Sequence, residues 1–264
     1  MALGQGQEIY RDDSSALAWL DSFSNDKPVK RKNLRRNFRN PSAQYFAAVA
    51  FHDAWPDALR KIEAAFNQIF KPGRGQLVLE FERVGAPLTY VPVPAIPGEF
   101  DDDGHEQDNL VSRAYAQILK DEIDAISADE NAVPVGMLVL VPSEESQQAR
   151  WARLALEQLT LSHDDIAFID YTDDRLRRSM ALSTEIRLCT FHSSRGLEGD
   201  RVVIFGLEQL EALTRAIKVK PENLGFIALS RGVFHTTVVV RTFFTTPIHT
   251  LLKEILRVFE TKSH

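Results

Sequence analysis

The sequence predicts an α/β domain in which a mainly parallel β-sheet is flanked by helices. From residue 135 onward, runs of consecutive apolar residues alternate with stretches of helical periodicity, the pattern of strand–helix–strand units. The chain has 264 residues, of which 44% are hydrophobic and 26% charged, as in ordinary globular proteins. A chain of this length can bury one large core or two modest ones.

The first half of the chain predicts three helices and two strands. SSALAWLDSF favours a short helix over residues 14–23, capped by Ser14 or Ser15. Residues 41–54 favour a second helix, and a third is expected from Pro56 to about Phe70, because proline suits a first helical turn. QLVLEFERVGAPLTYVPVP predicts two strands joined at Val84–Gly85, the second an edge strand because of its prolines. An amphipathic helix is expected near residues 107–126.

The second half predicts most of the sheet. VGMLVLVPS is continuously apolar, as expected for a strand covered on both faces, and a helix with glutamate in its first turn follows Ser143. Further strands are predicted at IAFID, IRLCT, RVVIFGL and TTVVVRT. Further helices are predicted near residues 207–216, 221–230 and 248–260.

Several kinds of chemistry find no support in the sequence. It contains no G-x-x-x-x-G-K-[ST] phosphate loop, no G-x-G-x-x-G and no G-x-S-x-G. We expect no metal site, because no histidines stand at metal-ligand spacing and DDDG lacks the spacing of a calcium loop. Cys189 is the single cysteine and is expected to lie in the core.

Charge is segregated along the chain. The net charge is −6, but residues 27–39 hold 7 basic residues of 13, and residues 99–108 hold 6 acidic residues of 10. A local basic run is compatible with nucleic-acid binding whatever the total charge. No apolar stretch has the length of a membrane span or resembles a signal peptide, so we expect a cytoplasmic protein without membrane contact.

The most informative stretch is CTFHSSRGLEGDRVVIFG, residues 189–206. It places many polar side chains directly after a predicted strand, where open parallel sheets hold their working residues. From Thr190 it resembles motif V of the UvrD/Rep-like superfamily 1 DNA helicases, T-x-H-x-x-K-G-L-E followed by a strand. Arg195 stands where that family usually has lysine.

Other stretches resemble helicase motifs in the family's order. NLRRNFRNPSAQYFAA, residues 33–48, is similar to motif IV, and ENLGFIALSRGVFHTTVVV, residues 222–240, is similar to motif VI. GQGQEIYR, near the start, is similar to the end of motif III, although the family's aspartate and basic–aromatic tail are absent.

The resemblance implies a RecA-like domain that lacks the phosphate loop itself. Residues 1–26 would be the tail of a first RecA-like domain or a linker, and residues 27–264 the second RecA-like domain. Within the latter, residues 72–134 would form a hairpin, acidic loop and helix in place of the family's large inserted subdomain. The first RecA-like domain would be missing from this chain.

The resemblance also implies a shared ATP site. Arg39 and Arg231 would be catalytic arginine fingers, and Gln7, Gly196 and Glu198 would also contact ATP. Mg²⁺ would be held by the missing N-terminal domain, so this chain alone would be inactive.

The implied partners are single-stranded or partly duplex DNA and the N-terminal RecA-like domain of the same protein. Tyr10, Thr190, His192 and Ser193 would contact the DNA strand.

For individual residues, purely structural explanations stay open. Arg39 is also explained as one more charge of the basic run, Arg231 as a favourable charge at a helix end, and Glu198 as a first-turn glutamate. The alternative for the whole chain is a non-catalytic module that keeps the helicase fold and binds DNA or protein.

Overall fold

The predicted α/β fold is confirmed. A computed structural model describes residues 36–37, 40–74, 80–81, 88–96, 108–127, 136–163, 166–172, 185–242 and 246–263. Its main sheet has six strands in the order β3-β8-β7-β4-β6-β5, and every neighbouring pair is parallel. The strands are β3 (Thr89–Val93), β4 (Met137–Val141), β5 (Ala167–Asp170), β6 (Glu185–Thr190), β7 (Gly199–Phe205) and β8 (Gly232–Arg241). This α/β architecture is consistent with a RecA-like domain.

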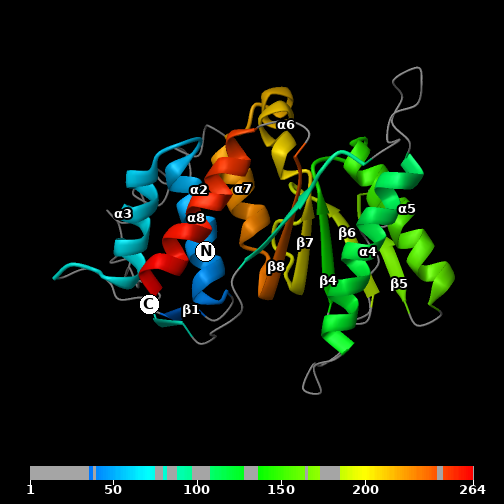
Figure 1. Cartoon of the computed structure of the whole chain (residues 1–264), viewed down its shortest axis with the longest axis horizontal. Helices are drawn as coiled ribbons and strands as arrows, with labels where there is room; N and C mark the ends of the chain where they lie inside the picture. The colour runs from blue at the N-terminus through cyan, green and yellow to red at the C-terminus, as the bar shows by residue number, and fades with distance from the viewer. Residues whose placement is uncertain are drawn as a thin grey trace, which may run out of the picture.

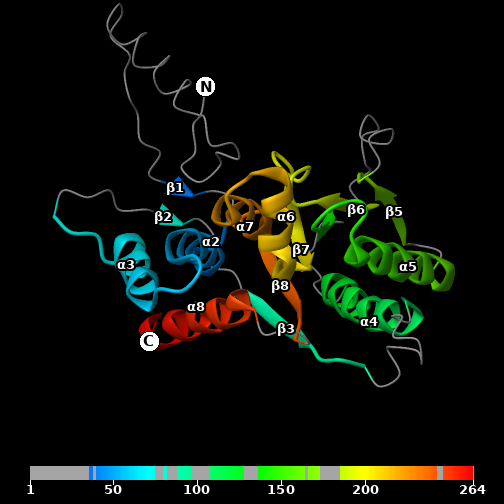
Figure 2. The ribbon, with the colours of Figure 1, turned by 90° about the horizontal axis from the view of Figure 1, so that it is seen from above.

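Helices cover both faces of the sheet (Figures 1 and 2). They are α2 (Ser42–Ala54), α3 (Leu59–Phe70), α4 (Asp108–Ser127), α5 (Gln147–Ser162), α6 (Leu210–Ile217), α7 (Pro221–Leu229) and α8 (Pro247–Ser263). The side chains of α4 and α5 share one buried cluster with Val139, and those of α2, α3, α7 and α8 share another with Leu138 and Leu140. All five residues of β4 are buried because helices lie on both sides of it, as its apolar run predicted.

Since all strands run the same way, their carboxyl ends lie together on one side of the sheet and their amino ends on the other. We call the side where β4, β6, β7 and β8 end the carboxyl edge, and the side where these strands begin the amino edge; neither term refers to the outer strands β3 and β5. The strand order reverses between β4 and β7, because the chain leaves β4 toward β5 and leaves β7 toward β8.

The predicted pairing of two strands within residues 76–94 is wrong. β2 (Glu80–Phe81) pairs with β1 (Arg36–Asn37) in a small sheet of its own, whereas β3 pairs with β8. The two strands therefore belong to different sheets and form no hairpin with each other. The edge position of β3 is confirmed, and Pro92 is tolerated there because an edge strand bonds to one neighbour only.

Helix starts differ from prediction by a few residues. α3 begins at Leu59 instead of Pro56. α5 begins at Gln147, where the Ser146 side chain accepts a hydrogen bond from the Ala149 amide, so the glutamates after Ser143 precede the helix. The predicted helix at residues 14–23 lies outside the described residues, and the proposed division at residue 26 stays a prediction.

The packing of α7 against α2 yields a stability prediction. A Cβ at Gly225 would lie 2.1 Å from Cε1 of Phe51, a fully buried ring. We therefore expect Gly225→Ala to destabilise the domain by about 1–3 kcal/mol through overpacking, measured by urea unfolding. Adding Phe51→Leu should recover part of this loss, and equal stability of Gly225→Ala and the wild type would contradict the described packing.

Candidate functional site

The segment that resembles motif V connects the two edges of the sheet. Thr190 ends β6 at the carboxyl edge, residues 191–196 form turns, and Gly199 begins β7 at the amino edge. Gly196 adopts φ +84°, a left-handed conformation that favours glycine. The edges are about 15–20 Å apart, the length of strands of this size. The expectation that the whole segment lies at the carboxyl edge is therefore only half right.

Thr190 and Ser193 form a compact turn at the carboxyl edge. The Ser193 amide donates to Thr190 Oγ1 at 3.0 Å, and the Thr190 amide donates to Ser193 Oγ at 2.9 Å. The two hydroxyl oxygens lie 3.0 Å apart. His192 is exposed between them, whereas Thr190 is buried. The turn thus fixes its own backbone and presents His192 outward.

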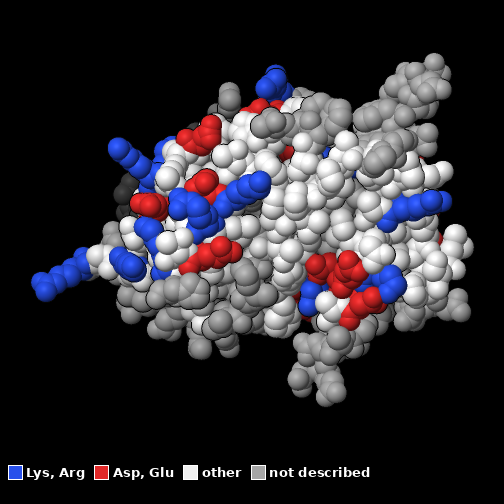
Figure 3. All heavy atoms as spheres, in the orientation of Figure 1, with Lys and Arg blue, Asp and Glu red and all other residues white. Residues whose placement is uncertain are grey.

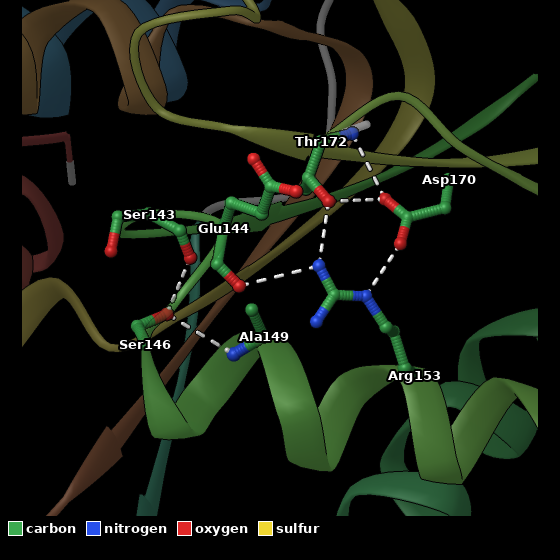
Figure 4. Close-up of polar contacts among 7 residues, drawn as sticks. All are labelled: Ser143, Glu144, Ser146, Ala149, Arg153, Asp170 and Thr172. Carbon is green, nitrogen blue, oxygen red and sulfur yellow. Dashed lines mark hydrogen bonds and ion pairs between the residues drawn. The ribbon is translucent and has the colours of Figure 1, made fainter. Parts of the chain in front are cut away.

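Two other loops at the carboxyl edge are joined by a polar network around Arg153 (Figure 4). Arg153 of α5 bonds to Asp170 at the end of β5, to Thr172 Oγ1 and to the Glu144 carbonyl. Asp170 also accepts from the Thr172 amide at 2.9 Å. Because these contacts join the β4–α5 loop to the end of β5, they order the carboxyl edge on both sides of β6.

Arg231 lies at the amino edge, between α7 and β8. Its side chain is only 2% exposed and is the largest fully buried one among the described residues. The guanidinium donates to the Ile227 carbonyl at 2.8 Å, to Ser230 Oγ at 2.9 Å and to the Leu197 carbonyl at 3.2 Å. Arg231 therefore bonds to the last turn of α7 and also to the residue before Glu198.

The N-terminal end of α2 reaches the same place. Asn40 Nδ2 donates to the carbonyls of Ser230 and Gly232, at 3.0 and 2.7 Å, on either side of Arg231. Gln44 Nε2 donates to the Leu229 carbonyl at 3.1 Å. Sequence reasoning missed both amides, although Asn40 directly follows Arg39 in the stretch that resembles motif IV.

The predicted site residues thus fall into separate groups. Glu198, which is exposed, and Arg231 lie at the amino edge, and Thr190, His192 and Ser193 lie at the carboxyl edge. Gly196 lies in the connecting turns. Gln7, Tyr10 and Arg39 lie outside the described residues, so their roles stay predictions.

A buried carboxyl group follows β7 at the carboxyl edge. Desolvation raises the pKa of Glu208 to about 7, and the nearby main-chain amides of Glu208 and Arg241 only partly oppose this rise. Arg241, at the end of β8, is also buried, and desolvation lowers its pKa. Its guanidinium lies 5.8 Å from the centroid of the Trp151 ring.

Surface charge and metal-ligand side chains indicate no further binding site in the described part of the chain. On the face shown in Figure 3, Lys and Arg over α3 and α8 are interspersed with Asp and Glu, so this face is not continuously basic. Within the described ranges, no three His, Cys, Asp or Glu side chains gather as a metal site would require. No helix in the described part of the chain has the length and apolarity needed to cross a bilayer.

Comparison with solved structures finds chains that are similar to this one. A solved structure described as the C-terminal domain of a possible DNA helicase from Lactobacillus plantarum WCFS1 aligns with 83% of this chain and 94% of its own, at a TM-score of 0.41 and 12% identity. No family model and no curated protein matches the sequence.

Proposed function

We propose that the chain is the second RecA-like domain of a UvrD/Rep-like, ATP-dependent DNA helicase. The observation that carries the proposal is the meeting of three motif-like segments at the amino edge. Asn40, next to Arg39, bonds on both sides of Arg231, and Arg231 bonds to the carbonyl next to Glu198. Segments far apart in the sequence, each resembling a different helicase motif, are therefore joined by hydrogen bonds.

This edge suits a nucleotide held mainly by another domain. Arginine stabilises transferring phosphates because its planar fork contacts two oxygens at once, and Arg39 and Arg231 would supply this contact to the γ-phosphate. Glu198 is exposed and would accept a hydrogen bond from the ribose. By the resemblance, Gly196 and Gln7 would also contact the nucleotide. For Arg231 to reach a phosphate, its bonds to Leu197 and Ser230 would be exchanged for phosphate oxygens when the domains close. ATP and Mg²⁺ would be bound chiefly by the first RecA-like domain.

The carboxyl edge suits contact with a DNA strand. Thr190, His192 and Ser193 offer small polar groups to the sugar–phosphate backbone, and Tyr10 would stack on a base. ATP-driven closing and opening between the two RecA-like domains would then move this edge along single-stranded or partly duplex DNA.

One observation favours the alternative, a non-catalytic module that binds DNA or protein. Arg231 is almost fully buried and already bonds to three protein groups, so the structure alone explains its presence. ATP hydrolysis separates the two candidates, because only the helicase domain would support it.

The DNA contact gives a specific prediction. In the protein that contains both RecA-like domains, His192→Ala should raise the DNA concentration for half-maximal ATPase stimulation about tenfold, because one backbone contact is lost while the ATP site is unchanged. The measurement is ATPase rate against concentration of single-stranded DNA.

The matched control is His163→Ala, since His163 follows the end of α5, at the opposite edge from His192. It should leave the DNA dependence unchanged. Equal DNA dependence of His192→Ala and the wild type would argue against a strand contact at this turn.

A further inference from the structure

Arg187 of β6 reaches the same segment as Arg231 from the other side. Its Nη2 donates to the Glu198 carbonyl at 2.8 Å. The guanidinium passes close over Gly136, where a Cβ would lie 2.5 Å from Nη2. No motif of the sequence draws attention to Arg187.

Two guanidinium groups thus hold consecutive carbonyls. Arg231 bonds to the carbonyl of Leu197, and Arg187 bonds to that of Glu198. The main chain continues this attachment, because the Gly199 amide donates to the Arg231 carbonyl at 3.2 Å and the Asp200 amide to the Gly136 carbonyl at 3.1 Å. In this structure the backbone of Glu198 is thus held on both sides, while its side chain stays exposed. The bond from Arg187 would remain when Arg231 exchanges the Leu197 carbonyl for a phosphate oxygen.

The partial burial of Arg187 costs free energy, which a residue with no role beyond packing would not need to pay. Its Nε is buried and has no hydrogen-bond acceptor among the described residues. A buried unsatisfied donor costs free energy, so an uncharged side chain at this position would avoid the penalty. The bond to Glu198 gives a reason for an arginine here.

We infer that Arg187 is a positioning residue that orients Glu198 toward the ribose of a bound nucleotide. This inference rests on the proposed function. A contact to the ribose is made equally in the ground state and in the transition state, so its loss raises KM without lowering kcat. Arg187 would therefore act on KM, in contrast to Arg231, which would act on kcat.

The test is a double-mutant cycle in the protein that contains both RecA-like domains. Glu198→Gln and Arg187→Gln should each raise KM for ATP about five- to tenfold with kcat within about twofold. The KM of the double variant should be no higher than that of Glu198→Gln, because both changes act on the same contact to the ribose. Arg187→Lys should recover part of the affinity, and Arg215→Gln, at an 82% exposed side chain, should change nothing.

The outcomes separate the inference from the function beneath it. A raised KM in Glu198→Gln with a normal KM in Arg187→Gln, or effects that add fully, would overturn the positioning role alone. Unchanged KM in both variants, or no ATPase in the wild type, would overturn the proposed function and the inference with it.

Discussion

Replacing Arg231 by lysine, or Arg39 by alanine, should lower the kcat of DNA-stimulated ATP hydrolysis about 10³-fold, the effect expected for an arginine finger. The measurement is steady-state ATPase of the protein that contains both RecA-like domains. Nucleotide affinity should fall far less, because the γ-phosphate gains its extra charge contact mainly in the transition state.

Lysine is the informative replacement at position 231. It keeps a positive charge near the Ile227 and Leu197 carbonyls but cannot contact two phosphate oxygens with one planar group. Alanine would leave these carbonyls without the arginine donor and so lower stability as well. Folding is checked by the unfolding midpoint, and an unchanged kcat in both Arg231→Lys and Arg39→Ala would contradict the finger role.

Glu208→Gln should stabilise the domain at neutral pH. The pKa of Glu208 is about 7 in the folded state, against an ordinary value of 4.5. As pH rises from 4.5 to 7, the unfolded chain releases this proton while the folded state keeps it, so the wild type loses stability over this range. Above pH 7 both states are ionised and the loss levels off at about 3 kcal/mol.

The glutamine variant lacks this titration. Its free energy of unfolding should match the wild type near pH 4.5 and exceed it by about 2–3 kcal/mol at pH 7.5, measured by urea unfolding across the range. Glu145→Gln, at an exposed position, is the matched control and should show no such divergence. Parallel pH profiles for Glu208→Gln and the wild type would show that Glu208 is not a buried acid.

The sheet was largely predictable because its strands are buried on both faces. Continuous apolar runs such as β4 have few alternatives in a chain of this composition, and the helices between them set a parallel direction. Pairing within residues 76–94 was mispredicted because strand propensity says nothing about partners. β3 finds its partner in β8, far along the chain, and not in its sequence neighbour.

The site was predictable as a set of residue types and not as a geometry. Sequence patterns singled out Glu198 and Arg231. They did not indicate that the short connection from β6 to β7 places Glu198 at the opposite edge of the sheet from Thr190. Nor did they indicate that Arg231 turns inward, since this depends on carbonyls of Ile227 and Leu197 that only the folded chain brings together. The role of Arg187 could not be predicted either, because its partner is a main-chain carbonyl that only the folded chain brings near.

The central claim is that the amino edge completes an ATP site held by another RecA-like domain. It is tested most directly by comparing DNA-stimulated ATP hydrolysis of this chain alone with that of the protein containing both domains. The account predicts essentially no turnover by the chain alone and DNA-stimulated turnover when both domains are present. Robust hydrolysis by the isolated chain, or none by the two-domain protein, would contradict it.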